Sequence, residues 1–295
     1  MMRKEGLSDW KRALILIVVL GIALFGYIKH TTLDIKNING KIIFQDPATE
    51  GGNRGLVILS LPQKSVLPLG IYGDKARFMD SDSRIIVSHM DGEVSLYDTK
   101  SNTQKVVYQS ENKEMGRYEI ASVDKSHFSV VDNNNLFLVN IFDGTKKKMF
   151  NYANSEYSWA NNGKTLYYDK KIDGKTRIIK YDIDTSKEVQ IDVGSSPRIS
   201  KDGSVIVYWC ESPVKNEGHY LKVKNLNTNE EWKYTWPIFD YCLSPDGKYL
   251  ATVEHWRGIG FYKAYTVKIV DYKNGKSKKV LDKYANGCTD IDWID

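Results

Sequence analysis

Short stretches in which hydrophobic and polar residues alternate recur along most of the chain. Clear examples are Arg177–Ile183 and Lys222–Leu226. Alternation with a period of two predicts β-strands with one buried face, and its recurrence predicts many such strands packed face to face. No stretch outside the N-terminal apolar segment shows the periodicity of a helix. The pattern therefore indicates an all-β domain.

The clearest unit of this pattern is Tyr241–Tyr272, which reads YCLSPDGKYLATVEHWRGIGFYKAYTVKIVDY. It predicts a short strand, a Ser-Pro-Asp-Gly turn, a strand over Lys248–Val253, a long loop and a strand over Ala264–Asp271. A further turn and a strand over Lys278–Leu281 follow. Proline presets φ, Asp bonds nearby backbone, and Gly accepts positive φ, so the turn is specified by its residues. The unit is thus four short antiparallel strands.

Looser copies of this unit repeat along the chain in two phases. The turn before the second strand recurs at Gly40, Ser83, Ser126, Gly163, Gly203 and Gly247, at intervals of 37 to 44 residues. The end of the third strand recurs at Ser60, Asp98, Asn140, Asp182, Asn225 and Asp271, at intervals of 38 to 46 residues. Four-stranded units with a period of about 40–45 residues are typical of propeller blades. The sequence therefore predicts a six-bladed β-propeller.

The first blade lacks its own first strand, and the chain ends with a stretch that supplies one. Blade one contributes strands over Lys41–Phe44, Gly55–Leu61 and Ser65–Leu69, and the C-terminal Thr289–Asp295 resembles a first strand, with Trp293 matching Trp159. Pairing of the C-terminus with blade one would close the ring and remove its open edges. The other blades are predicted over Ala76–Gln109, Tyr118–Phe150, Tyr157–Ile191, Arg198–Tyr234 and Tyr241–Leu281.

These residues carry a family resemblance. SPDGKYLATV, followed by a strand ending in VDYKNGKSKKVL, resembles the TolB-like, WD-repeat-related propeller repeats of bacterial envelope proteins. The resemblance extends over roughly Gly40–Asp295 and is strongest in the last three copies. It implies a fold and a binding role in the envelope. TolB-like proteins typically carry an additional domain that is not found here, so the resemblance does not extend to a particular partner.

An uncharged segment, Ala13–Ile28, lies between Arg12 and Lys29. Sixteen apolar residues are at the short limit for spanning a bilayer, and flanking aromatic and basic residues extend the segment. No signal-peptidase site follows it, so an uncleaved signal anchor is favoured over a cleaved signal peptide. The basic residues before it predict a cytoplasmic N-terminus and an exported domain at the cell membrane. The expected domains are a cytoplasmic tail (1–12), the transmembrane segment (13–28), a linker (29–39) and the propeller (40–295).

Composition narrows the classes of function. The net charge is +5, of which the N-terminal tail supplies +2, and the near balance of the remainder does not indicate a nucleic-acid surface. The 19 tyrosines suit half-buried strand faces. The three cysteines, Cys210, Cys242 and Cys288, do not form a disulfide framework. They are interpreted as small apolar strand residues, with a single Cys242–Cys288 bond as the alternative.

Binding residues are expected on loops that emerge on one face of the ring. The spacing of the two phases predicts long loops between the second and third strands in blades one, four, five and six. Loops on a rigid scaffold are where binding residues concentrate, and clustered Trp, Tyr and Arg are typical of binding hot spots. The candidate residues for a protein or glycan partner are Trp209, Glu211, His219, Trp236, Asp240, Glu254, His255, Trp256, Arg257 and Tyr262. The competing interpretation is that Trp209, Trp236 and Trp256 pack blades five and six together.

Catalytic and metal motifs are not found in the sequence. It contains no Gly-x-Ser-x-Gly, no His-Glu-x-x-His and no phosphate-binding glycine loop, so no catalytic residue, metal or cofactor is predicted. The alternative function is a hydrolase that acts on a sugar or lactone through a carboxylate pair drawn from Asp240, Glu254 and Asp290. Binding, not catalysis, is the favoured function.

Overall fold

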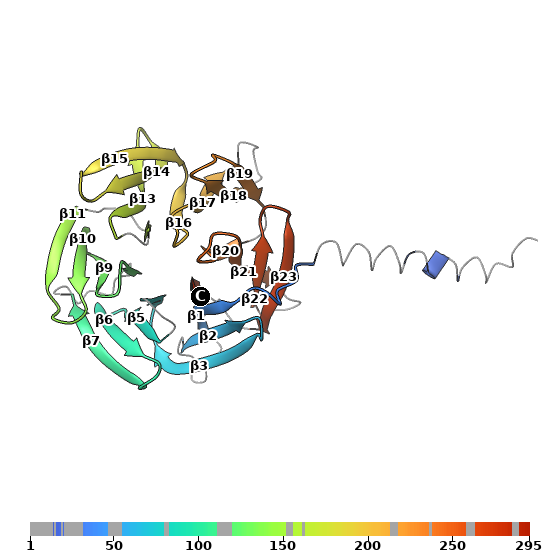
Figure 1. The fold of residues 1–295 in the computed structure, drawn as a ribbon, viewed down its shortest axis with the longest axis horizontal. Helices are drawn as coiled ribbons and strands as arrows, with labels where there is room; N and C mark the ends of the chain where they lie inside the picture. Colours follow the sequence, from blue (N-terminus) through green and yellow to red (C-terminus); the bar gives the residue numbers. More distant parts are fainter. Residues whose placement is uncertain are drawn as a thin grey trace, which may run out of the picture.

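In a computed structural model, the described residues form six four-stranded antiparallel sheets arranged around a central axis (Figure 1). The structure describes residues 14, 16–18, 20, 32–46, 55–79, 83–110, 120–151, 156–160, 163–212, 218–235, 238–257, 263–284 and 289–295. Of residues 151, 255–257, 263–264, 283–284 and 289 it describes the backbone only. The six-bladed β-propeller predicted from the repeats is therefore confirmed.

The strands follow the predicted blades closely. Blades one and two contain β1 (Gly40–Asp46), β2 (Gly55–Leu61), β3 (Ser65–Tyr72), β4 (Lys75–Phe78), β5 (Arg84–Ser88), β6 (Glu93–Asp98) and β7 (Thr103–Gln109). Blades three and four contain β8 (Ile120–Ser122), β9 (His127–Asp132), β10 (Asn135–Asn140), β11 (Lys146–Asn151), β12 (Tyr157–Trp159), β13 (Thr165–Ile172), β14 (Lys175–Asp182) and β15 (Lys187–Val193). Blades five and six contain β16 (Ser195–Ile199), β17 (Val205–Glu211), β18 (His219–Asn225), β19 (Glu231–Tyr234), β20 (Ile238–Leu243), β21 (Leu250–Arg257), β22 (Lys263–Asp271) and β23 (Lys276–Tyr284), and β24 (Thr289–Ile294) completes blade one.

The C-terminal strand closes the ring as predicted. Strand β24 pairs antiparallel with β1, with Trp293 opposite Ile42, and the order of strands in the first sheet is β24-β1-β2-β3. Trp293 is almost fully buried, as is its counterpart Trp159 in β12. Closure therefore joins the two ends of the propeller by main-chain hydrogen bonds and by burial of a large aromatic side chain.

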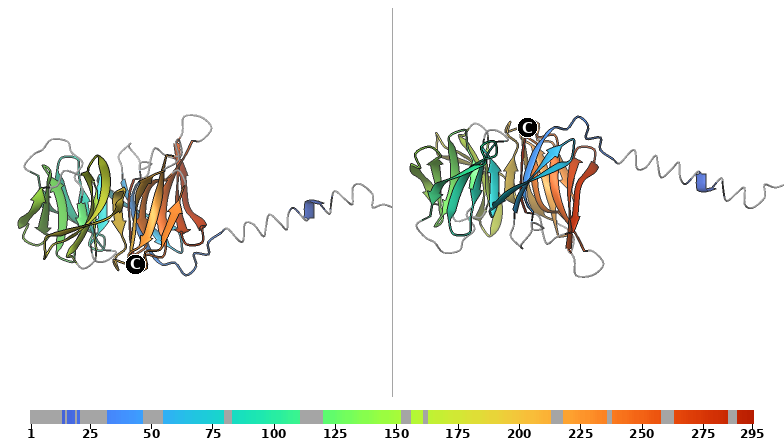
Figure 2. Two further views of the ribbon diagram at one scale, coloured as in Figure 1. Left: turned by 90° about the horizontal axis from the view of Figure 1, so that it is seen from above. Right: turned by 90° about the horizontal axis from the view of Figure 1, so that it is seen from below.

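The ring has two distinct faces. In every blade the first-to-second and third-to-fourth turns lie at one end of the strands, and the other loops lie at the opposite end. The C-terminus lies at the end that carries the first-to-second and third-to-fourth turns, which is called here the C-terminal face. The segment before β1 approaches the ring on the same side (Figure 2). The other face is called the opposite face.

Each interface between adjacent blades contains a cluster of buried apolar side chains. Strands β1–β3 and β4–β7 share one such cluster, which includes Ile43, Leu56, Phe78 and Ile85. The interface of blades six and one includes Ile42, Val253, Tyr265 and Trp293, together with residues of the linker. Because a blade exposes apolar residues on both of its faces, it is stable only between two neighbours. The core is thus divided among the blade interfaces.

Tyrosine hydroxyls cross all six blade interfaces. The hydrogen bonds join Tyr97 to the Leu69 carbonyl (3.4 Å), Tyr108 to Asp132 (2.6 Å), Tyr157 to Ser129 (3.0 Å), Tyr208 to Asp192 (2.5 Å), Tyr241 to the Ser196 carbonyl, and Tyr265 to Asp46 (3.1 Å). A tyrosine buries an apolar ring while its hydroxyl finds a polar partner. The high tyrosine content of the chain is explained in part by this role.

Two expectations from the sequence are corrected by the structure. Blade four has no long loop between its second and third strands: Asp173-Gly174 forms a two-residue turn, and β13 and β14 are each eight residues long. The extra residues lengthen the hairpin because the alternation of the sequence continues through them. The segment before β1 is also more than a spacer, since Leu33, Ile35 and Ile38 are buried against blades six and one.

Most of the predicted transmembrane segment lies outside the described residues. Within the part of the chain that the structure describes, no helix combines the length and the apolar character needed to cross a membrane.

Closure gives a specific requirement for glycine at position 40. Gly40 has φ of 125°, and a Cβ there would overlap the Trp293 indole nitrogen and the Ile294 carbonyl. Gly174 also has positive φ (76°), but open space surrounds the position of its Cβ. Gly174→Ala should cost about 1–2 kcal/mol of unfolding free energy from backbone strain alone, and Gly40→Ala about 1–3 kcal/mol more because of the overlap.

Urea unfolding of the full chain in detergent, followed by circular dichroism, measures both variants. Equal losses of stability in Gly40→Ala and Gly174→Ala would contradict the tight contact between β24 and the start of β1.

Candidate functional site

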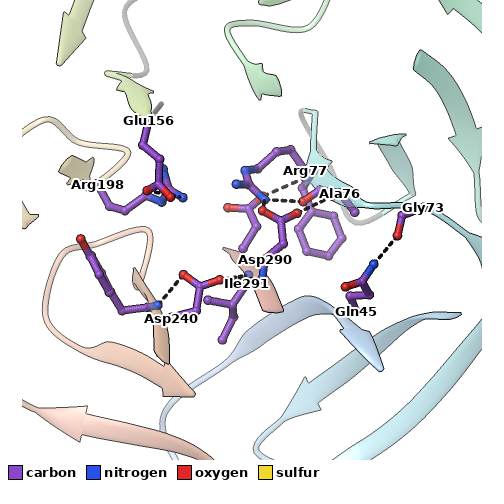
Figure 3. Close-up of polar contacts among 12 residues, drawn as sticks. Gln45, Gly73, Ala76, Arg77, Glu156, Arg198, Asp240, Asp290 and Ile291 are labelled. Carbon is purple, nitrogen blue, oxygen red and sulfur yellow. Dashed lines mark hydrogen bonds and ion pairs between the residues drawn. The ribbon is translucent and has the colours of Figure 1, made fainter. Parts of the chain in front are cut away.

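The innermost strands of the blades surround the axis, and side chains from neighbouring blades bind their inward-facing backbone. The Asp290 carboxylate accepts the Ala76 N–H (2.6 Å), and Asp292 accepts the Phe78 N–H (2.9 Å). Asp240, in turn, accepts the N–H groups of Asp290 (2.5 Å) and Ile291 (3.2 Å). Strands β20, β24 and β4 are therefore joined in sequence around the axis (Figure 3).

Strands β24 and β16 each contain a β-bulge with a positive-φ residue where they pass the axis. Asp290 and Ser196 both have positive φ (63° and 56°), and the register of each strand shifts at that position. Asp240 holds the Asp290 bulge from blade six. The Ser196 bulge is bound from both sides, by Asp169 of blade four at its N–H (3.2 Å) and by Tyr241 of blade six at its carbonyl. Bulges of this kind redirect side chains and are frequent near functional sites.

A buried arginine and a largely buried one lie beside these bulges. Arg77 forms an ion pair with Asp290 (2.6 Å), and Arg198 forms one with Glu156 (3.3 Å). The exposed fractions of the two arginine side chains are 9% and 13%. Figure 3 shows both pairs facing the centre of the ring, with Asp240 close by. Residues far apart in the sequence thus form one charged cluster at the axis.

Burial and charge change the acidity of this cluster. Burial alone would lower the pKa of Arg77, but the charge of Asp290 outweighs it and the pKa is raised. The pKa of Arg198 is raised as well, because Glu156 and other carboxylates outweigh burial. Burial raises the pKa of Asp240 and lowers that of Lys75. The arginines consequently remain charged, whereas Asp240 resists ionisation.

The predicted residues of blade five lie at the end of one hairpin. Glu211 and His219 are opposite each other in β17 and β18, and both are exposed on the opposite face. Trp209 is partly buried, and its ring makes an edge contact with Tyr241 of blade six at 5.6 Å between centroids. Trp209 thus packs blade five against blade six, as the competing interpretation of the sequence predicts.

The predicted carboxylates do not form one cluster. Asp240 and Asp290 meet at the axis, but Glu254 is fully buried in β21, where it pairs with Lys268 and accepts a hydrogen bond from Tyr234 (3.3 Å).

His255, Trp256 and Arg257 belong to strand β21 and not to a loop, and the structure describes their backbone only. Trp236 and Tyr262 lie outside the described residues. The role of these five residues in binding stays a prediction.

Two of the three cysteines are small buried strand residues, as expected. Cys210 and Cys242 are buried free thiols, and burial raises the pKa of each. Cys288 lies outside the described residues. Within the described part of the chain, no group of His, Cys, Asp and Glu side chains is arranged to hold a metal ion.

Sequence reasoning missed Arg77, Arg198 and Glu156. The signal that was available is a charged residue inside a short first strand, as in KARF (β4) and SSPRI (β16), where apolar residues are expected. A lone charge in such a strand shows only that it faces something polar. Its partner depends on the ring geometry, which the repeats do not specify.

The raised pKa of Asp240 predicts an unusual pH dependence. Between the ordinary aspartate pKa of 3.8 and the higher folded value, the native state binds more protons at this site than the unfolded state. Asp240 therefore lowers stability as the pH rises through this window. The Asp240→Asn variant should become more stable relative to the unmodified chain as the pH is raised above 3.8.

Asp192→Asn is the matched control, since hydrogen bonds from Tyr208 and Lys222 outweigh burial and lower the pKa of Asp192. That variant should lose relative stability as the pH rises toward 3.8 from below. Urea unfolding at several pH values measures both, and a decline of Asp240→Asn over its own window would refute the assignment.

Comparison with known proteins establishes the fold. No family model matches the sequence, and no curated protein matches it either. Among solved structures, TolB from Acinetobacter baumannii superposes with a TM-score of 0.68 at 16% identity, covering 86% of this chain and 66% of that one. A putative TolB from Agrobacterium tumefaciens gives 0.58 at 13% identity, covering 85% and 91% of the two chains. A structure of a nidogen/laminin complex gives 0.60 at 10% identity, covering 85% and 97%.

The resemblance noted in the repeats is confirmed at the level of the fold. The structure is a TolB-like six-bladed β-propeller.

Proposed function

We propose that the chain is a membrane-anchored, extracytoplasmic propeller that serves as a binding platform for a protein or glycan of the cell envelope. The proposal combines the apolar segment Ala13–Ile28, the basic residues before it, and the position at which the chain joins the ring. Proteins of the same fold include TolB and the propeller in a nidogen/laminin complex, where the second protein is a partner.

The position of the linker is the observation that carries the proposal. The Leu33 N–H donates to the Ser277 carbonyl (3.0 Å), and Thr32 forms a bridge with Ser277 at the start of β23. Only residues 29–31 separate this contact from the end of the apolar segment. A chain of that length spans at most about 14 Å. An anchor of this kind would hold the C-terminal face close to the bilayer and leave the opposite face directed away from it.

The opposite face offers groups suited to a partner. Glu211 and His219 are exposed at the tip of the blade-five hairpin, and Phe239 of β20 is 55% exposed. Exposed aromatic residues beside charged ones are typical of interfaces. The predicted residues Trp256 and Arg257 belong to the neighbouring blade and would extend this surface. A protein partner is favoured, and a glycan is the second possibility for the same surface.

The described contacts do not favour the alternative of a hydrolase. Asp240 accepts three backbone N–H groups, Asp290 pairs with Arg77, and Glu254 pairs with Lys268. A general acid or base must reach the proton that it transfers. These carboxylates instead hold strands together, so binding is the function that the geometry supports better.

Site-specific photocrosslinking in membranes tests the proposed surface. A photoreactive amino acid at His219 or Phe239 should give an adduct with an envelope component, because both positions are exposed on the opposite face. The control position is Lys248, which is exposed on the C-terminal face. Alanine at Trp256 and Arg257 should weaken the adduct. Equal yields of adduct at all three positions, or no adduct from His219 and Phe239, would contradict the proposal.

Deletion of residues 1–28 tests the anchor. The shortened chain should be released from membranes and should melt at the temperature of the full chain, because the described contacts of the ring begin at Thr32. Fractionation and thermal unfolding measure the two properties. Retention of the shortened chain in the membrane fraction, with partners removed by high salt, would show that this segment is not the anchor.

A further inference from the structure

A cavity of about 820 Å³ lies on the axis of the ring and is lined mainly by the innermost strands. Its lining includes Asp124, Lys125, Lys201 and the C-terminal Asp295, so it opens on the C-terminal face. Arg77 and Arg198 line it as well, and both lie deeper, within β4 and β16. Cavities of roughly 300–1,000 Å³ are typical of sites for small ligands.

The two arginines retain hydrogen-bond donors that reach this cavity. A guanidinium group has five N–H donors. The contacts of Arg77 involve Nη1, which bonds the Ala76 carbonyl and Asp290, and those of Arg198 involve Nη1 and Nη2. No nitrogen of either arginine is among the buried, unpartnered atoms of the described residues. The remaining donors are therefore accessible from the cavity.

The inner end of the cavity presents arginine donors but no excess of positive charge, because Asp290 and Glu156 pair with the two arginines. Asp290, Glu156 and Asp240 lie beside the arginines but are not part of the lining. Asp292 is part of it, and its carboxylate is bound by the Phe78 N–H. At the mouth, the carboxylates of Asp124 and Asp295 are balanced by Lys125 and Lys201. The arginines thus present planar N–H donors to the cavity, while the charge of each is offset by its own carboxylate partner.

The shape and lining of the cavity limit the ligand to a slim anion. A folded domain cannot reach side chains that are only 9% and 13% exposed within a ring, whereas a single sugar residue can. A carboxylate presents two oxygens in the plane that an arginine recognises best. The lining also contains the aromatic residues Tyr157 and Trp159 and the serines Ser122 and Ser158. This mixture suits a ring with one apolar face and several hydroxyl groups.

We propose that the inner end of this cavity binds the carboxylate of an acidic sugar that enters from the C-terminal face. Arg77 and Arg198 would bind the carboxylate, and the aromatic and serine residues around them would contact the sugar ring. The site opens on the C-terminal face, whereas the surface proposed for a partner is on the opposite face. Each proposal can therefore be tested and rejected independently of the other.

Calorimetric titration of the full chain, in a detergent without a sugar headgroup, tests the site. D-Glucuronate should bind at least about tenfold more tightly than D-glucuronamide, which differs only by loss of the charged carboxylate. N-Acetylglutamate, which has the carboxylate without the sugar ring, should bind more weakly than glucuronate. Equal affinity for glucuronate and glucuronamide, or no binding of either, would overturn the proposal, and equal affinity for N-acetylglutamate would overturn the assignment to a sugar.

Variants assign the binding to the arginines. Arg198→Gln should reduce the affinity for glucuronate by at least about tenfold. Arg198→Lys keeps the charge but not the planar fork, so its affinity should lie between those of Arg198→Gln and the unmodified chain. The matched control, Lys248→Gln, removes a positive charge from the same face outside the lining and should bind as the unmodified chain does. Near-ultraviolet circular dichroism verifies folding. Unchanged affinity in folded Arg198→Gln or Arg198→Lys would refute the site.

Discussion

The structure depends on one constraint: the backbone groups along the inward edge of the innermost strands need hydrogen-bond partners. A strand at the edge of a sheet presents N–H and carbonyl groups without a strand partner, and buried groups of this kind need hydrogen bonds. Around this axis, carboxylates of the neighbouring blade satisfy several of them: Asp240 binds β24, and Asp290 and Asp292 bind β4. The same contacts also join adjacent blades at the axis.

This arrangement makes ring closure and the charged axis a single feature. Asp290 lies in the C-terminal strand, yet it binds the backbone and side chain of blade two and is held by blade six. Its positive φ is tolerated because Asp is among the residues that adopt this conformation most readily. If β24 left blade one, Arg77 would lose its partner carboxylate, and a buried unpaired charge is costly. The cluster therefore adds to the main-chain pairing of β24 with β1.

The repeats predicted the architecture well because the period reflects local chemistry. Turn residues and alternation lie within each blade, and the match of Trp293 to Trp159 was sufficient to identify the closing strand. The charged axis was not predictable in the same way, since Arg77, Glu156 and Arg198 come from three blades and meet only in the closed ring. The predicted long loop in blade four was wrong because the number of residues between two turns does not distinguish a loop from a longer strand. Trp209 packs against Tyr241 of blade six, which is the competing interpretation from the sequence, and its role in binding stays a prediction.

The two faces of the ring have different chemical character. The cavity with its arginines opens on the C-terminal face, whereas Glu211, His219 and Phe239 are exposed on the other. Native-state hydrogen exchange of residues 289–294 tests the closure most directly. If β24 completes blade one, its amides should exchange as slowly as those of β1 and β2, through global unfolding. Fast exchange of β24, with β1 and β2 still protected, would show an open ring and contradict the account.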